Sequence, residues 1–378
     1  MRILFSTTAG AGHMGPLLPL ARACVSAGHE VRIACPERAR ESAAAAGLQP
    51  LTFSDLDAGA RAEFDRGLRG AGPEERNRLM VEELFGRLNA ESALPGLLDI
   101  FSAFDPQLVV REPFEPASWI AARAKGVPSV MVPCCTWHPM PLVGRLLRSG
   151  IETLALEHGV ELGAGADQDA QQIVSATPAS LEADLVVPAQ LRRLAPDPPS
   201  PARAPRGGVP KIFVCFGTVA GQIPGMLERV GQAVTEAVAG LDVRCLFATG
   251  RGVDHAKLGA IPENVEVTDY AILSEALADA SLAICHGGYG TTIGTLAVGV
   301  PTLALPLFSL DQWATAGAVA RAGAGATLDV PEQSASRLRA EIVSLLGDSR
   351  VDARAREIAA EMASHPSAHQ TVEQLTGS

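Results

Sequence analysis

The sequence predicts an α/β protein with two doubly wound parallel sheets, one in each half of the chain. Short apolar runs alternate with helical patterns, which is typical of βαβ units. An apolar run at 3–6 leads into a glycine-rich loop and a helical pattern over 17–27. The run at 212–216 restarts the same pattern and ends at Gly217-Thr218. We therefore expect two Rossmann-like domains that face an interdomain cleft.

The boundary between the halves is a segment rich in proline and glycine, 195–210, which has no apolar periodicity. Such a composition is typical of an extended, semi-rigid linker. With 378 residues, two domains are also the default expectation. We predict a first domain over 1–194, a second over 211–350, and a helical tail over 351–378. His365-Pro366 interrupts that tail, so we expect it to bend back onto the first domain.

The elements of the first half follow from apolar runs and helical periodicity. Pro16 suits the first turn of the helix at 17–27. The predicted strands are 3–6, 30–35, 108–111 and 129–132, and the predicted helices are 17–27, 74–89, 94–104 and 117–124. The segment 134–165 mixes aromatic, Met and Pro residues with helical pieces. It fits a lid or a ligand-lining segment, and Trp137 and Met140 fit a plain core position equally well.

The second half shows the same alternation of strands and helices. The predicted strands are 212–216, 243–248, 265–268, 282–285 and 302–305. The predicted helices are 226–238, 273–280, one starting near 291–292, 315–322, 335–346 and the tail at 352–375. The polar pair Asp311-Gln312 follows the last of these strands, and we place it at a strand end.

Composition excludes several function classes. Apolar residues make up 47% of the chain, which is enough for two cores. The net charge of −11 disfavours a nucleic-acid partner, because proteins that bind nucleic acids usually carry a basic face. No run of eighteen apolar residues is present, and the first apolar run is too short for a signal peptide, so we expect no membrane segment and a cytoplasmic protein. The seven cysteines show neither a CxxC pair nor zinc-ligand spacing, which indicates free thiols.

The stretch 282–312 contains the strongest candidate for a ligand site. The apolar run 282–285 ends at His286-Gly287-Gly288, directly before a helix. Glycines permit close approach of the backbone, and the start of a helix offers free N–H groups and a partial positive charge. These features suit the binding of a diphosphate. An ordinary βαβ unit explains Gly287 and Gly288 equally well.

The glycine-rich loop after the first strand contains a second candidate, His13. The loop matches the dinucleotide pattern G-x-G-x-x-G at Gly10, Gly12 and Gly15. The acidic residue that a nicotinamide or flavin site needs after the second strand is missing, because Cys35-Pro36 stands there. Alternatively, the glycines aim His13 into the crevice at the strand ends. A lone histidine can also be a surface or capping residue.

Glu112 follows the strand 108–111 and should lie at the same sheet edge as His13. An exposed loop carboxylate would look the same in the sequence. Two D-x-D strings, Asp55–Asp57 and Asp167–Asp169, resemble a metal–diphosphate motif. Neither follows a predicted strand, so chance explains them better.

Taken together, these motifs resemble the family 1 glycosyltransferases of the GT-B fold, particularly the actinobacterial enzymes that glycosylate natural products. The resemblance covers nearly the whole chain. It is most specific from Tyr270 through His286-Gly287-Gly288-x-Gly290-Thr291 to Asp311-Gln312, and Gly12-His13 before Pro16-Leu17 matches the first-domain motif. The resemblance implies an acceptor-binding first domain and a second domain that binds a nucleotide-sugar donor.

The resemblance also implies roles for individual residues. His13 corresponds to the general base and Glu112 to the aspartate that usually partners it, although glutamate is one methylene longer. The expected donor-binding residues are Thr218, Tyr270, His286, Gly287, Gly288, Gly290, Thr291, Asp311 and Gln312. Of these, Tyr270 stands where an aromatic side chain stacks on the nucleobase, and Asp311-Gln312 where the sugar hydroxyls bind. The expected acceptor-lining residues are Phe85, Phe114, Trp137, His138 and Met140.

One departure from the family pattern bears on the donor. Several members carry a glutamate bonded to the ribose hydroxyls in the helix after the phosphate loop, and Gly294 stands there in this chain. This favours TDP over UDP as the nucleotide of the donor. We expect inverting transfer of a deoxysugar to a hydroxyl of a hydrophobic aglycone, without metal or cofactor, by a monomer or homodimer.

Three alternatives remain at the level of sequence. A nucleotide-sugar epimerase or hydrolase of the same fold would need no acceptor. A silent nucleotide-sugar-binding auxiliary would need neither His13 nor Glu112. A nicotinamide oxidoreductase would need the acidic residue that is missing after the second strand.

Overall fold

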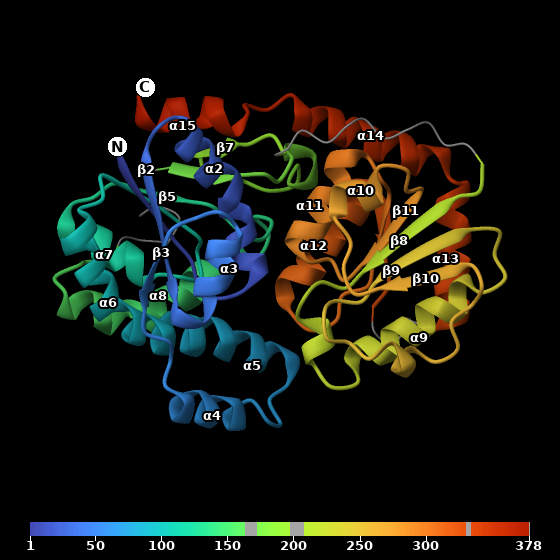
Figure 1. Ribbon diagram of the computed structural model, residues 1–378, viewed down its shortest axis with the longest axis horizontal. Helices are drawn as coiled ribbons and strands as arrows, with labels where there is room; N and C mark the ends of the chain where they lie inside the picture. Colours follow the sequence, from blue (N-terminus) through green and yellow to red (C-terminus); the bar gives the residue numbers. More distant parts are fainter. Residues whose placement is uncertain (163–171, 197–207, 330–333, 378) are drawn as a thin grey trace. The chain divides into compact units, whose positions relative to one another are not determined.

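The computed structural model describes residues 1–162, 172–196, 208–329 and 334–377 (Figure 1). The chain forms two compact units. The first unit comprises Met1–Ala176, Leu185–Leu194 and Pro366–Ser378, and the second comprises Thr177–Asp184 and Ala195–His365. The chain thus enters the second unit briefly at 177–184, crosses to it again at 195, and returns to the first unit at Pro366.

The first unit contains a seven-stranded parallel sheet in the order β3-β2-β1-β4-β5-β6-β7. Its strands are β1 Arg2–Ser6, β2 Glu30–Pro36, β3 Pro50–Phe53, β4 Leu108–Arg111, β5 Ser129–Met131, β6 Gln172–Ser175 and β7 Leu191–Arg193. The strand order reverses between β1 and β4, which pair in parallel. In doubly wound sheets the crevice at such a reversal, at the carboxyl ends of the strands, is the usual place for a ligand.

Alternating side chains on β1 divide the core of the first unit between the two faces of the sheet. Ile3 and Phe5 pack in a cluster with the apolar side of α2, whereas Leu4 packs with α6 and α7 on the other face. The helical segments are α1 Ala11–Met14, η1 Gly15–Leu17, α2 Leu18–Ser26, η2 Glu37–Ala39, α3 Arg40–Ala45, α4 Ala58–Gly67, α5 Pro73–Arg78, η3 Leu79–Leu88, α6 Asn89–Phe104, α7 Ala117–Lys125, α8 Met140–Glu157 and α15 Ala368–Thr376.

The segment η3 is a π-helix and packs backbone to backbone against α8. A Cβ atom on Gly150 would lie 2.9 Å from the Cα of Gly86, and one on Gly86 would lie 3.2 Å from the Cα of Gly150. Only glycine at both positions permits this approach without a shift of one helix. π-Helical turns often occur at functional sites, and this one carries Phe85.

The second unit contains a six-stranded parallel sheet in the order β10-β9-β8-β11-β12-β13. Its strands are β8 Lys211–Cys215, β9 Arg244–Ala248, β10 Val265–Thr268, β11 Leu282–Cys285, β12 Thr302–Ala304 and β13 Gly325–Thr327. Its helical segments are η4 Ala179–Leu181, η5 Ala220–Gln222, α9 Met226–Val238, η6 His255–Leu258, α10 Leu273–Leu277, α11 Tyr289–Val298, α12 Leu310–Arg321, α13 Ala335–Gly347 and α14 Ser349–Ala363. The order reverses between β8 and β11, and the loops after both strands contain glycine.

The C-terminal tail is divided between the two units. We expected all of 351–378 to pack on the first domain, but α14 packs on α11 within the second unit. Only α15 returns to the first unit, where it lies beside α2 (Figure 1). Its Ala368 and Val372 join the core there. The division falls at His365-Pro366, where the sequence interrupts the helical pattern. Ser367 then starts α15 with a capping box completed by Gln370.

Four strands were missed because their sequences are short and lack a run of apolar residues. These are β3, β6, β7 and β13. A further difference concerns Asp311-Gln312, which we placed at a strand end. In the structure β12 ends at Ala304, and the pair occupies the first turn of α12. The linker 195–210 and the second D-x-D string lie mostly or wholly outside the described residues.

Two expectations about the chain as a whole can be compared with the structure. All seven cysteines are free, so the prediction of free thiols is confirmed. In the part of the chain that the structure describes, no helix has the length and apolar character needed to cross a membrane.

Candidate active site

His13 and Glu112 come together at the carboxyl edge of the first sheet. His13 belongs to the short helix α1 just after β1, and Glu112 directly follows the neighbouring strand β4. Gly10 starts α1 with a φ of 126°, a conformation that a residue with a side chain rarely adopts. His13 Nδ1 lies 3.3 Å from Glu112 Oε2.

The Glu112 carboxylate is fully buried and fixed by backbone donors. The N–H of Thr8 donates to Oε1 at 3.0 Å, and the N–H of Phe114 donates to Oε2 at 2.7 Å. A carboxylate fixed in this way accepts the Nδ1–H of His13 and leaves the lone pair on Nε2. The His13 side chain is 23% exposed, so Nε2 can serve a substrate while Nδ1 is held from behind.

Two further titratable groups lie around this pair. Cys134 Sγ is 3.7 Å from His13 Nδ1 and 3.9 Å from Glu112 Oε2. Glu115 is buried, accepts a 2.7 Å hydrogen bond from the Ser6 hydroxyl, and also accepts the N–H of Ser118. Burial raises the pKa of Glu115 to about 7 against these hydrogen bonds, and the nearby Glu112 contributes in the same direction.

Phe85 and Phe114 form an apolar wall around the imidazole of His13. Their ring centroids lie 5.5 and 5.3 Å from that of His13, and 5.3 Å from each other. Both rings are half-buried and rest on a buried cluster that contains Trp137 and Met140. An apolar ligand beside His13 would therefore meet aromatic surface first.

Trp137 and Met140 lie in the core, which is the alternative that the sequence left open beside an acceptor-lining role. They are 4% and 3% exposed and belong to the core below Phe85 and Phe114. Large apolar side chains on a helix start and its preceding loop look the same in the sequence whether they line a pocket or support it. His138, between them, is half-buried.

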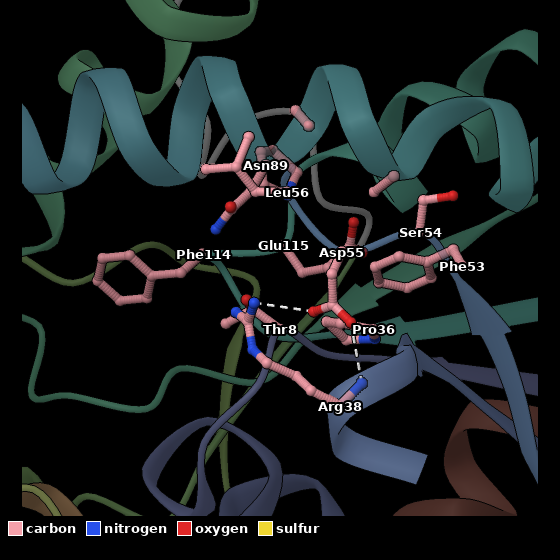
Figure 2. A pocket seen from close by; sticks show the side chains of 13 residues that line it. Thr8, Pro36, Arg38, Phe53, Ser54, Asp55, Leu56, Asn89, Phe114 and Glu115 are labelled. Atoms are coloured by element: carbon pink, nitrogen blue, oxygen red, sulfur yellow. Dashed lines mark hydrogen bonds and ion pairs between the residues drawn. The ribbon is translucent and has the colours of Figure 1, made fainter. Parts of the chain in front are cut away.

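A pocket opens in the first unit next to the loop that follows β4 (Figure 2). Thr8 and Phe114, which hold Glu112 through their N–H groups, both line it, and Glu115 adds a carboxyl group. Across the pocket, Arg38 pairs with Asp55 at 2.8 Å through its side chain and donates its backbone N–H to the same carboxylate, as Figure 2 shows. The pocket thus combines aromatic surface with several polar groups.

The first D-x-D string has structural roles. Asp55 pairs with Arg38, and Asp57 caps α4 by accepting the N–H groups of Gly59 and Ala60. We expected no strand before this string, but β3 ends at Phe53, two residues before Asp55. Both carboxylates nevertheless have the structural roles just described.

His286 is held tightly at the end of β11 in the second unit. A Cβ on Gly217 would lie 2.8 Å from its Cε1, and one on Gly288 would lie 2.3 Å from its Nε2. The ring also stacks on Phe308 at 6.4 Å between centroids. Its Nδ1 is buried without a hydrogen-bond partner among the described residues. Burial lowers the pKa of His286 to about 4, so the ring is neutral at neutral pH.

The turn between β11 and α11 has room only for glycine at position 287. Gly287 has a φ of 79°, and a Cβ there would lie 2.6 Å from the backbone oxygen of Gln312. Gln312 in turn is buried, and its Oε1 accepts the N–H groups of Leu307 and Phe308. Gln312 therefore shapes the loop that carries Phe308, a role that sequence reasoning did not predict.

The N-terminus of helix α11 lies at this turn. Its first N–H groups have no partner inside the helix, and Gly288 offers no capping side chain. Gly290 is exposed in the first turn, Thr291 is half-buried beside it, and a Cβ on Gly290 would meet nothing within 4 Å. The arrangement is a ready site for an anion.

The remaining predicted donor residues lie on loops of the same unit. Thr218 is exposed after β8, and Asp311 is half-buried in the first turn of α12. Tyr270 is 62% exposed, and the guanidinium of Arg251 lies 5.3 Å from its ring centroid. Such an exposed ring with a cation on one side is suited to stacking with a flat ligand.

Gly294 lies on α11 against Leu273. A Cβ at position 294 would lie 2.6 Å from Leu273 Cδ2, so the apolar side chain fills the space that a larger residue would need. Position 294 therefore has no polar side chain of its own, and its nearest side chain, Leu273, is apolar.

Several site residues escaped sequence reasoning. Cys134 and Glu115 follow strands whose neighbours carry His13 and Glu112, so their places at the sheet edge could have been found from the strand order. Gly217 and Phe308 could not have been found from the strand order, because they matter through their contact with His286.

Comparisons with known proteins identify the family. The model for the N-terminal domain of erythromycin biosynthesis protein CIII-like proteins matches residues 22–139, and the model for their C-terminal domain matches 232–377. The chain belongs to the EryCIII-like glycosyltransferases. The second match contains the whole stretch from Tyr270 to Gln312.

Full-length relatives of this EryCIII-like glycosyltransferase agree. The L-demethylnoviosyl transferase of Streptomyces niveus is 27% identical, over 97% of this chain and 95% of its own. The structure of the glycosyltransferase SnogD from Streptomyces nogalater is 26% identical, with a TM-score of 0.78 over 100% of this chain and 99% of its own. The predicted resemblance to natural-product glycosyltransferases and the predicted GT-B fold are confirmed.

The same fold occurs in ligand complexes of a neighbour. The spinosyn rhamnosyltransferase SpnG complexed with thymidine diphosphate is 23% identical, with a TM-score of 0.79 over 99% of this chain and 100% of its own. Its complex with spinosyn aglycone gives a TM-score of 0.82 at 22% identity and the same coverage.

Proposed function

We propose that this EryCIII-like glycosyltransferase transfers a deoxysugar from a TDP-sugar to a hydroxyl of a hydrophobic natural-product aglycone, with inversion and without a metal ion. The observation that carries the proposal is the 3.3 Å contact between His13 Nδ1 and the buried Glu112. A histidine oriented in this way has the geometry of a general base.

The first step of the proposed reaction is removal of the acceptor proton. Glu112 holds the Nδ1–H and stabilises the imidazolium that forms when Nε2 takes the hydroxyl proton. The acceptor oxygen then attacks the anomeric carbon in one displacement, which inverts its configuration. Phe85 and Phe114 exclude water around the imidazole and offer an apolar aglycone a contact surface.

The second unit supplies stabilisation for the departing diphosphate. The N-terminus of α11 would present the positive end of the helix dipole to the diphosphate. His286 contributes as a neutral hydrogen-bond donor, because burial keeps its pKa well below 7. The positive field therefore comes from the helix, and no metal ion is required in this scheme.

The nucleotide is proposed from Gly294 and Tyr270. Exposed Tyr270 offers a stacking surface for the base, and position 294 offers no polar group for a ribose hydroxyl. This suits a deoxyribose, and a neighbour of the same fold binds thymidine diphosphate. The pocket beside Glu112 is proposed to hold part of the aglycone, since it shares Phe114 with the wall around His13.

Product analysis tests the proposal. Purified enzyme is incubated with TDP-deoxysugars and a panel of polyketide aglycones, and products are analysed by mass spectrometry and by the anomeric coupling constants. We expect an inverted glycoside in the complete reaction and no new sugar product with donor alone. Conversion of the donor without acceptor would instead indicate an epimerase or hydrolase.

The role of His13 is tested separately. His13→Ala should lower turnover on the order of 10²–10⁴-fold, the usual contribution of a general base. Donor binding, measured by calorimetry, should stay near that of the wild type because the donor residues lie in the second unit. Near-normal turnover of the variant would rule out this assignment.

A further inference from the structure

The positions of three potential ligands in the first unit match a metal site. His13 Nδ1, Glu112 Oε2 and Cys134 Sγ lie within 4.8 Å of one another. The separations are 3.3 Å from nitrogen to oxygen, 3.7 Å from sulfur to nitrogen and 3.9 Å from sulfur to oxygen. A tetrahedral Zn²⁺ with ordinary bond lengths separates such ligands by about 3.3–3.6 Å. Shifts of a few tenths of an ångström would bring all three onto one ion.

We propose that His13, Glu112 and Cys134 form a three-ligand site for Zn²⁺ or a similar thiophilic ion, and that its occupation stops sugar transfer. The inhibitory part rests on the proposed role of His13 as the base.

The chemistry of the ligand set favours zinc over magnesium. A thiolate, an imidazole and a carboxylate are the usual zinc ligands, whereas magnesium prefers oxygen atoms in octahedral geometry. The Cys134 thiol becomes a thiolate by releasing its proton to solvent, and together with the Glu112 carboxylate it balances the charge of Zn²⁺. Glu112 is already oriented by the N–H groups of Thr8 and Phe114, as metal-bound carboxylates usually are by their outer partners.

Inhibition follows from the two nitrogens of the imidazole. In the proposed active form Nδ1 carries the proton that Glu112 accepts, and Nε2 is free to act as base. A metal ion on Nδ1 takes that lone pair, so the proton of the neutral ring must sit on Nε2. Nε2 can then no longer accept the proton of the acceptor hydroxyl. The ion also removes the carboxylate that would stabilise the imidazolium.

Direct binding is the first experiment. Tag-free protein is stripped with chelator and titrated with Zn²⁺ by calorimetry, and with Cd²⁺ while the ultraviolet thiolate-to-cadmium band is followed. We expect one equivalent to bind. Cys134→Ser should abolish the cadmium band and weaken zinc binding by roughly 100-fold or more, because loss of a ligand exceeds the 10–100-fold typical of outer-shell changes.

Matched controls separate this site from other thiols. Cys24→Ala removes a buried thiol of the same unit, on α2, and should leave the cadmium band unchanged. Circular dichroism and thermal unfolding of both variants show whether each is folded. A band that survives Cys134→Ser in folded protein, or wild-type protein that binds no zinc, would overturn the site.

Transfer assays then test inhibition. Zinc should reduce the rate of the wild type in proportion to occupancy, and chelator should restore it, whereas millimolar Mg²⁺ should have no effect. In Cys134→Ser the rate, relative to that of the same variant without zinc, should resist zinc. Undiminished transfer by fully zinc-loaded enzyme would overturn the inhibitory part. Failure of the base assignment is recognised independently, by His13→Ala in metal-free buffer.

Discussion

His13 Nδ1 lies 3.3 Å from Glu112 Oε2, and the two residues come from loops after the paired strands β1 and β4. Glu112 is fully buried and His13 partly exposed, so the carboxylate faces the protein and the imidazole faces the substrate side. The longer side chain of glutamate reaches the histidine because the N–H groups of Thr8 and Phe114 hold both carboxylate oxygens.

Glu112→Gln should impair catalysis more than folding. The amide keeps the size of the side chain but removes the charge that stabilises the imidazolium, so kcat should fall on the order of 10²–10⁴-fold, as for loss of general-base catalysis. The amide NH₂ must also face the N–H of Thr8 or Phe114, which should cost about 1–3 kcal/mol of stability. Steady-state kinetics and thermal unfolding measure the two effects. Glu112→Asp is the control, and we expect partial activity from it. Equal kcat for Glu112→Gln and the wild type would contradict the dyad.

His286 should make the protein less stable in mild acid. Burial lowers its pKa to about 4 in the folded state, from an ordinary value near 6.5. As pH falls through this window the unfolded chain takes up the proton first, so stability is full above pH 6.5 and declines towards pH 4. The loss approaches the order of 3 kcal/mol, at 1.36 kcal/mol per pKa unit.

The measurement compares His286→Gln with the wild type by urea unfolding at pH 7, 5.5 and 4. Both proteins share all other acid-sensitive groups, so the difference in their pH slopes isolates His286. We expect the free energy of unfolding to fall less steeply with decreasing pH in His286→Gln than in the wild type. Parallel slopes would show that the imidazole titrates normally.

The pairing of His13 with Glu112 was predictable because Glu112 directly follows one apolar strand of a doubly wound pattern and His13 lies between the neighbouring strand and the helix after it. Parallel strands bring such residues to one edge, whatever lies between them in the chain. Cys134 follows β5, but its loop also carries Cys135 and Trp137, which look like core residues, so the sequence did not distinguish Cys134. Contact with His13 depends on side-chain direction, which periodicity does not report.

Burial explains the other differences between expectation and structure. Trp137 and Met140 have the composition of a ligand wall, yet they support Phe85 and Phe114 from below. Gln312 has the position of a sugar-binding residue, and its side-chain Oε1 accepts the backbone N–H groups of Leu307 and Phe308. In each case the residue type was compatible with two roles, and only its three-dimensional neighbours decide between them.

Substitution by alanine should lower the stability of the protein at Gly287 and should not lower it at Gly290. Gly287→Ala places a side chain at a φ of 79° and 2.6 Å from the Gln312 oxygen, so the turn must shift and stability should fall by about 2 kcal/mol or more. Gly290 lies in the first turn of α11 with open space around it, so Gly290→Ala should be neutral or stabilise by up to about 1 kcal/mol. Urea unfolding of both variants gives the comparison. Donor binding should weaken strongly in Gly287→Ala, since the diphosphate is proposed to bind at this turn. Similar free energies of unfolding for the two variants would show that the turn is not constrained.

TDP should compete with the donor much better than UDP. Position 294 presents no polar side chain to a ribose hydroxyl, and Leu273 occupies the adjacent space, with its Cδ2 2.6 Å from where a Cβ would stand. Desolvating an unpaired 2′-hydroxyl against this apolar contact should cost UDP about 1–3 kcal/mol, or roughly ten- to a hundredfold in inhibition constant. Inhibition constants for TDP, UDP and 2′-deoxy-UDP, measured in the transfer assay, separate the sugar from the base. We expect 2′-deoxy-UDP to recover most of the difference. Stronger inhibition by UDP than by TDP would exclude the TDP preference, and equal inhibition by UDP and 2′-deoxy-UDP would remove Gly294 and Leu273 as its cause.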